Sequence, residues 1–211
     1  MNSLKKSIFG SFVLLILFAG SVYAQQAQQT NKFVYKKTLH NTFPQMSITP
    51  YGGALFPLPK LMNQNFKPGG NLNLDLGYRV NREVGFYGKV GYYFMSSKIS
   101  GAPIGQYFEV SAGPRYYFTN VHVKSELFFE GGVGAYDFTQ KSYANPLDIN
   151  GAVIGQINNT KFGLNGGIGS NLYLTDAVDI VVKSKYHVIF TPNGTTSFLT
   201  VGGGLSFRFG L

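Results

Sequence analysis

The sequence predicts an all-β fold, a closed antiparallel transmembrane β-barrel of about eight strands. Apolar and polar residues alternate with a period of two from Met46 onward, as successive side chains do on the two faces of a strand. The connections between these segments alternate between long and short, and aromatic residues gather near the ends of the apolar faces. A barrel that crosses a bilayer produces both of these further patterns.

The segments with this alternation have the length of membrane-crossing strands, since a tilted strand needs about 9 to 11 residues to cross the bilayer. The expected strands are 47–56, 71–80, 84–95, 106–118, 123–136, 161–174, 178–190 and 197–209. Their number is even, which brings both ends of the barrel to the same side of the membrane.

The connections divide into two classes. Long ones, rich in Gly, Asn, Pro and Ser, occupy 57–70, 96–105 and 137–160, whereas 81–83, 119–122 and 175–177 are tight turns. The last connection, Asn193-Gly194, is typical of a type I′ hairpin turn. With this turn, the residue numbers of two paired positions add up to 387. We therefore expect the short turns and both termini on the periplasmic side and the long loops outside.

Alternation alone does not separate a membrane barrel from a soluble ligand-binding barrel, whose faces are inverted. Two observations favour the membrane. Apolar-face aromatics cluster at both rims: Tyr78, Tyr116, Phe118, Phe207 and Phe209 at one, and Phe56, Tyr92, Phe94, Phe108, Phe162 and Phe190 at the other. Glycines occupy the polar face, where a narrow interior needs room for larger side chains: Gly132, Gly134, Gly163, Gly167, Gly169, Gly202 and Gly204.

Two prolines lie inside expected strands, and a closed barrel has no edge at which a missing ladder bond is harmless. We expect a bulge or a strand end near Pro50 and near Pro114.

The N-terminus has the form of an export signal over residues 1–24. Lys5 and Lys6 precede an apolar run over 8–19, and Val22-Tyr23-Ala24 supplies small residues at the first and third positions of a cleavage site. A retained membrane anchor is the alternative, but no stop-transfer segment supports it. The Gln-rich stretch 25–45 is expected to be a flexible periplasmic leader, and 46–211 the barrel domain.

Composition excludes several classes of protein. No cysteine occurs, so disulfides and a lipid-modified N-terminal cysteine are excluded. Removing Lys5 and Lys6 from 18 basic residues leaves 16 against 9 acidic ones, a net charge of +7. The basic residues are scattered singly, which argues against nucleic-acid binding and favours contact with anionic lipid headgroups.

Two short motifs, Gly113-Pro114-Arg115-Tyr116-Tyr117-Phe118 and the closing Gly204-Leu205-Ser206-Phe207-Arg208-Phe209-Gly210-Leu211, resemble the small outer-membrane β-barrel domain family, of the OmpX, OmpW and OmpA type. The closing motif is similar to the strand that such proteins present to the barrel-assembly machinery, although its last residue is Leu211 and not an aromatic. The resemblance implies an outer-membrane location. It leaves activity open, since the family includes anchors, channels, adhesins and lipid-modifying enzymes.

Charged residues recur on the polar faces, and we expect them to fill the barrel as a network of ion pairs. Asp179 is expected to face Arg208, and Glu126 and Glu130 to reach Arg115. The candidate network is Arg79, Lys89, Glu109, Arg115, Glu126, Glu130, Asp179, Lys183, Lys185, His187 and Arg208, with Asp75 and Lys124 on the same faces. The alternative is a narrow polar conduit for small solutes, lined by Lys183, Lys185 and His187.

An enzyme needs a nucleophile, a base and an orienting group within reach of one another. His40, His122 and His187 are the available imidazoles, and none has an evident partner, so neither catalysis nor lipid modification is expected. No metal-ligand spacing or phosphate loop occurs, and no cofactor is expected. The 137–160 loop, with an apolar run at Ala152-Val153-Ile154, is the best candidate for a surface partner, or is a loop without one.

Overall fold

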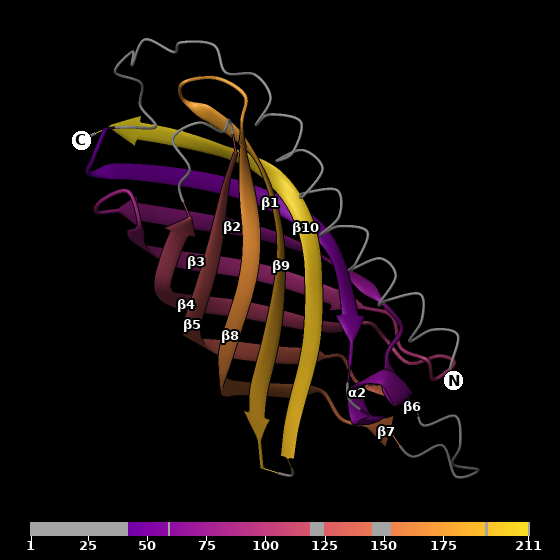
Figure 1. Ribbon diagram of the computed structural model, residues 1–211. Helices are drawn as coiled ribbons and strands as arrows, with labels where there is room; N and C mark the ends of the chain where they lie inside the picture. The colour runs from indigo at the N-terminus through magenta and orange to yellow at the C-terminus, as the bar shows by residue number, and fades with distance from the viewer. Residues whose placement is uncertain (1–41, 59, 119–124, 145–152, 193, 211) are drawn as a thin grey trace. The chain divides into compact units, whose positions relative to one another are not determined.

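The computed structural model describes residues 42–58, 60–118, 125–144, 153–192 and 194–210 (Figure 1). The expected signal segment and nearly all of the expected leader lie outside these residues, as does the expected turn at 119–122. The first strand begins at Gln45, the last residue assigned to the leader.

Eight strands close into one antiparallel barrel, which confirms the predicted fold class. Around the barrel the order is β1, β10, β9, β8, β5, β4, β3 and β2, so neighbours in sequence are neighbours in space and β1 pairs with β10 to close it. The strands are β1 (Gln45–Pro57), β2 (Gly69–Arg79), β3 (Val84–Met95), β4 (Gly105–Phe118), β5 (Ser125–Gln140), β8 (Ile157–Tyr173), β9 (Val178–Thr191) and β10 (Gly194–Gly210).

Three short elements lie at the end of the barrel opposite the C-terminal end of β10 (Figure 1). They are the helix α2 (Lys60–Asn65) and the two strands β6 (Tyr143–Ala144) and β7 (Val153–Ile154), which pair with each other outside the barrel. We call this the loop end, and the end with the connections at 80–83 and 174–177 the turn end. Within the described ranges, no helix is long and apolar enough to cross a membrane.

The longest connection is shorter than the sequence predicted. Asp137 pairs with Thr160 and Gln140 with Ile157, so β5 and β8 continue for several residues into the expected loop 137–160. Polar residues such as Asn158 and Asn159 resemble a loop in sequence, but they pair with Thr139 and Phe138 of β5. The connection itself runs from Lys141 to Gln156.

The expected bulges at the prolines are absent. Pro50 pairs regularly with Leu74, while the ladder to β10 skips it without a change of register. Pro114 likewise pairs with Phe86, and the ladder to β5 skips it. A residue in an antiparallel ladder directs its N–H to one neighbouring strand, and for each proline this is the strand that the ladder skips. The barrel therefore loses ladder bonds locally and keeps its register.

The last hairpin also differs from the expectation. Thr191 pairs with Gly194, so paired positions sum to 385 and not to 387. Pro192 explains the shift, because its fixed φ suits the first central position of a turn. Each residue of β9 thus pairs two positions away from its expected partner in β10, and a shift by two leaves every side chain on its expected face.

The two faces of the wall differ as predicted. Apolar side chains of the outer face are exposed, with Leu72 64%, Val133 52% and Phe162 56% accessible, whereas Lys89, Glu109 and Asp179 point inward with 2% or less. The aromatics expected at the two rims are exposed, Phe56 only partly. In a bilayer these apolar atoms contact hydrocarbon chains, and the polar groups are confined to the interior.

Interior glycines make room for large rings. A Cβ at Gly132 would lie 2.4 Å from the Tyr87 hydroxyl, and one at Gly169 would lie 2.3 Å from the Phe128 ring. A larger side chain at these positions would displace the rings, so glycine is favoured there.

Candidate functional site

The interior of the barrel is filled with buried polar side chains, and it holds every residue of the candidate network. Among the described residues, six basic and five acidic side chains are buried there, with exposed fractions of 6% or less. They form three clusters along the barrel axis, which we name the turn-end, middle and loop-end clusters.

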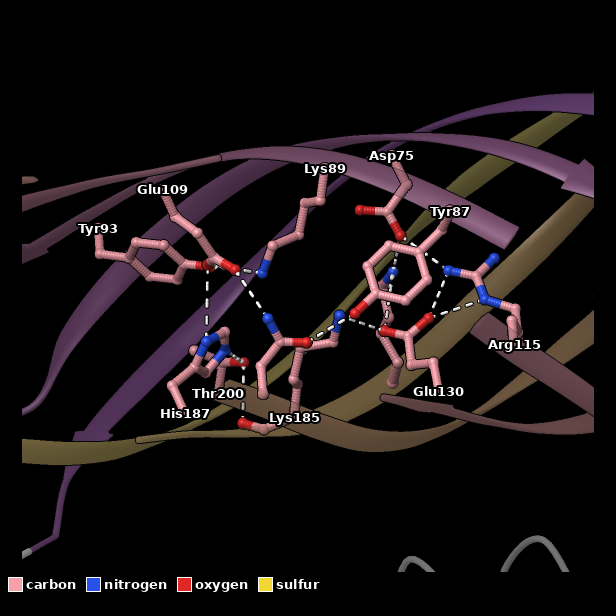
Figure 2. A network of polar contacts seen from close by, with 12 residues as sticks. Asp75, Tyr87, Lys89, Tyr93, Glu109, Arg115, Glu130, Lys185, His187 and Thr200 are labelled. Atoms are coloured by element: carbon pink, nitrogen blue, oxygen red, sulfur yellow. Dashed lines mark hydrogen bonds and ion pairs between the residues drawn. The ribbon is translucent and has the colours of Figure 1, made fainter. Parts of the chain in front are cut away.

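The middle cluster consists of Asp75, Arg115, Glu130, Lys183 and Lys185, and Figure 2 shows its contacts. Arg115 lies opposite Glu130 on the neighbouring strand, and its Nε donates to Glu130 Oε2 at 2.7 Å. Lys185 Nζ lies 2.6 Å from Glu130 Oε1. Asp75 pairs with Arg115 at 3.0 Å and with Lys183, which stands on a strand that does not neighbour its own. These pairs therefore bridge the lumen.

The turn-end cluster consists of Arg79, Glu126, Asp179 and Arg208. Arg79 donates two hydrogen bonds to the Glu126 carboxylate, at 2.8 and 2.6 Å. This bidentate geometry makes arginine–carboxylate pairs strong and directional. Arg208 pairs with Asp179, as expected, although Asp179 lies directly opposite Ser206 and reaches Arg208 diagonally.

The loop-end cluster centres on Glu109, which is fully buried. Lys89 Nζ lies 2.7 Å from Glu109 Oε2, and the Tyr93 hydroxyl donates to the same oxygen. Tyr136 donates to Glu109 Oε1 at 3.1 Å, and its hydroxyl lies 3.1 Å from Nδ1 of His187. Glu109 thus contacts side chains of β3, β5 and β9, and Figure 2 shows Lys89, Tyr93 and His187 around it.

An apolar plug covers the loop-end cluster on its outer side. The His187 ring stacks on Phe198 with centroids 4.5 Å apart, and Phe198 also contacts Tyr107. Met62, from α2, is buried in the same group, so the helix covers this end of the lumen. The buried members are Leu55, Met62, Tyr93, Met95, Tyr107, Tyr136, Ile189 and Phe198.

Cation–π contacts add to the ion pairs. The Lys183 ammonium lies 3.9 Å from the centroid of the Tyr51 ring, and the Arg79 guanidinium lies 3.9 Å from that of Tyr117. Each cation is therefore held by a carboxylate and by an aromatic face, and both attractions are strong where water is excluded.

The structure departs from the sequence prediction in the partners of one carboxylate. Glu126 was expected at Arg115, but its carboxylate pairs with Arg79 and lies 3.7 Å from Arg208. Lys124 lies outside the described residues. Lys183, Lys185 and His187, the expected lining of a conduit, are all 4% exposed or less and make ion-pair or ring contacts.

The sequence did not predict which polar residues connect the clusters. The Lys185 ammonium lies 4.1 Å from the centroid of the Tyr87 ring, and Tyr87 donates to Asn165 Oδ1 at 2.6 Å. Asn165 Nδ2 lies 3.3 Å from Glu109, so these two residues connect the middle and loop-end clusters. Both residues stand at inward positions of the alternation, so the sequence indicated that they face the lumen but not which residues they contact. Within the described ranges, no group of three His, Asp or Glu side chains is arranged to hold a metal ion.

Comparisons with known proteins agree with this architecture. The model of the outer membrane protein beta-barrel domain family matches residues 12–209. No curated protein sequence matches the chain.

Solved structures of small outer-membrane barrels are similar in fold. Neisserial surface protein A is 15% identical, with a TM-score of 0.60 over 78% of this chain and 97% of its own. OprG of Pseudomonas aeruginosa is 13% identical, with a TM-score of 0.55 over 83% of this chain and 100% of its own. A major outer membrane protein of Thermus thermophilus is 15% identical, with a TM-score of 0.52 over 78% of this chain and 99% of its own. At such identities the likeness concerns the fold alone.

Proposed function

Because the chain belongs to the outer membrane protein β-barrel domain family and lies in the bacterial outer membrane, we propose that it is a sealed barrel which conducts no solutes and anchors its longer connections at the cell surface. One observation carries this proposal: charged side chains meet across the lumen over the length of the barrel, under an apolar plug. An eight-stranded barrel is narrow enough for its own side chains to fill.

A conducting path needs water along the axis, and two features oppose it. Moving Lys183 or Lys185 aside breaks buried ion pairs, which costs several kcal/mol when one charge is left without its partner. Moving the plug aside exposes Phe198, which is fully buried. A lipid-modifying activity has no comparable support, since His187, the one histidine in the described part of the chain, is buried in the lumen and not on the lipid face.

Current recordings in planar lipid bilayers test the proposal. We expect the refolded wild-type barrel to give no discrete current steps in concentrated potassium chloride. Discrete steps that shrink in Phe198→Trp, which narrows the loop end, would contradict it. Phe94→Trp is the matched control, because Phe94 is an aromatic side chain on the lipid-facing side of the wall and is 40% exposed.

The loop end faces the cell exterior in this proposal, and both ends of the barrel sequence face the periplasm. Ser142 and Asp176 are exposed at the loop end and the turn end respectively. In intact cells, a membrane-impermeant thiol reagent should label Ser142→Cys and leave Asp176→Cys unlabelled, and the chain has no cysteine of its own to interfere. The opposite pattern would invert the orientation.

Two partners follow from this placement. The outward Phe207 and Phe209 of β10 form the strand end that the barrel-assembly machinery would bind, so Phe209→Ser should lower the folded fraction in cells more than after refolding from urea. The connection between β5 and β8, within the region 137–160, is the proposed contact with a surface partner. Deleting 145–152 should preserve the folded barrel and reduce attachment of cells to an immobilised glycan or protein array.

A further inference from the structure

A small cavity remains inside the barrel between the middle and turn-end clusters. Its volume is about 10 Å³, roughly the room that one water molecule occupies. Four cationic side chains line it, whereas no carboxylate is among its described lining residues. The cations are Arg79, Arg115, Lys183 and Arg208, and Ser47, Thr49 and Ser206 also line the cavity.

The charges of the described interior do not balance. Six buried basic side chains face five acidic ones, which leaves a net charge of +1. The surplus belongs to the middle cluster, where Arg115, Lys183 and Lys185 share two carboxylates, and two of these three cations line the cavity. An uncompensated charge in a dry interior is costly, so a single negative ion at this place would stabilise the barrel.

Donors are also available at the cavity. Nη2 of Arg208 is buried without a hydrogen-bond partner, and it lies 3.7 Å from Oε2 of Glu126. Thr49 Oγ1 donates to Ser206 Oγ at 2.9 Å, which leaves the Ser206 hydrogen free to turn elsewhere. A buried donor without an acceptor is rare in proteins and is commonly explained by a bound water or ion.

We propose that this cavity binds one small monovalent anion, of the halide class, between the Arg208 guanidinium, the Lys183 ammonium and the serine and threonine hydroxyls. Chloride is larger than the water molecule for which the cavity has room, so the hydroxyl groups that line it must turn and the wall must shift to accommodate the ion, while Lys183 keeps its ion pair with Asp75. Polyatomic anions such as sulfate exceed the available volume. The site lies on the turn side of the middle cluster and requires no conduction through the barrel.

Bromide tests the proposal because it substitutes for chloride and scatters anomalously. Crystals of the full chain in detergent, grown in sodium bromide, should show an anomalous peak in the cavity close to Arg208. In Ser206→Val the added methyl groups fill the cavity without changing any charge, and the peak should disappear. Ser125→Val is the matched control, since Ser125 is a buried serine of β5 that does not line the cavity, and it should keep the peak.

A solution measurement guards against a variant that crystallises poorly. The urea midpoint of the refolded wild type should be higher in bromide than in gluconate, which is too large for the cavity, at equal ionic strength. The difference should persist in Ser125→Val and vanish in Ser206→Val. Absence of the anomalous peak in well-diffracting wild-type crystals, or an equal bromide effect in both variants, would overturn the proposal.

Discussion

The two ends of the ion pair between Lys185 and Glu130 should contribute unequally to stability. Glu130 binds Arg115 at 2.7 Å and Lys185 at 2.6 Å, and Lys183 lies 3.9 Å away. The middle cluster holds three cations and two carboxylates. Glu130→Gln therefore raises its net charge from +1 to about +2, whereas Lys185→Met lowers it to about zero.

The expected magnitudes follow from these contacts. Removing one partner of a buried pair and leaving cations uncompensated costs about 3 to 5 kcal/mol, the expected loss for Glu130→Gln. Lys185→Met keeps the volume of the stem and loses one charge-assisted contact, about 1.5 to 3 kcal/mol. The double variant should lose less than the sum of the two, because each change removes the partner that the other leaves unpaired.

The assay is equilibrium unfolding in urea of barrels refolded into lipid vesicles, followed by circular dichroism and by the gel mobility of the folded form. Equal slopes against urea would show that only stability has changed. An equal loss in the two single variants, or a larger loss for Lys185→Met, would refute the assignment of the surplus charge to this cluster.

Two further pairs of variants test the packing of the wall. Gly132→Ala places a methyl group against the Tyr87 hydroxyl and should lower the free energy of unfolding by about 1 to 3 kcal/mol. Gly88→Ala, with no atom within 4 Å of its Cβ, should change stability little. Equal effects of the two variants in urea unfolding would contradict the interior packing. Val133→Arg, on the lipid face between the two aromatic rims, should lower the free energy of unfolding by about 2 to 4 kcal/mol, and Phe118→Arg, at a rim, by about 1 kcal/mol or less. The reverse order, measured by unfolding in vesicles, would contradict this placement of the two residues in the bilayer.

Strand periodicity accounts for how closely the fold could be predicted. A period of two specifies the face of each side chain, and β3 begins and ends at the residues expected for it. Periodicity does not fix where pairing stops. The part of the β5–β8 ladder that lies within the expected loop includes residues such as Asn158 and Thr160, which are typical of loops. The helix α2 was missed for a similar reason, since six residues carry too little helical period to detect.

The prolines illustrate a local exception. A proline in a closed barrel was expected to force a bulge, but one residue in an antiparallel ladder bonds to one neighbouring strand only. Pro50 and Pro114 are each aligned so that the missing N–H falls in a short gap of the ladder. The sequence contains no signal for this alignment, because it depends on the stagger of the paired strands.

The candidate site was predictable in its residues and less so in its contacts. Alternation placed Arg79, Glu126 and Lys183 inside, but their partners stand on strands that are not adjacent. Which of them meet depends on the tilt and stagger with which the sheet closes, and these are properties of the whole barrel. Arg115 and Glu130 were the easier pair, since they lie opposite each other on neighbouring strands.

Thiol accessibility tests most directly that the lumen is filled by the chain's own side chains. Ser111 points inward beside the middle and loop-end clusters and is 4% exposed, and the cysteine-free chain gives no background. In the folded, membrane-inserted barrel, a small charged methanethiosulfonate reagent should leave Ser111→Cys unmodified until urea unfolds it, while Ser142→Cys at the loop end reacts at once. Reaction of Ser111→Cys in the folded barrel at a rate near that of Ser142→Cys would contradict a sealed interior.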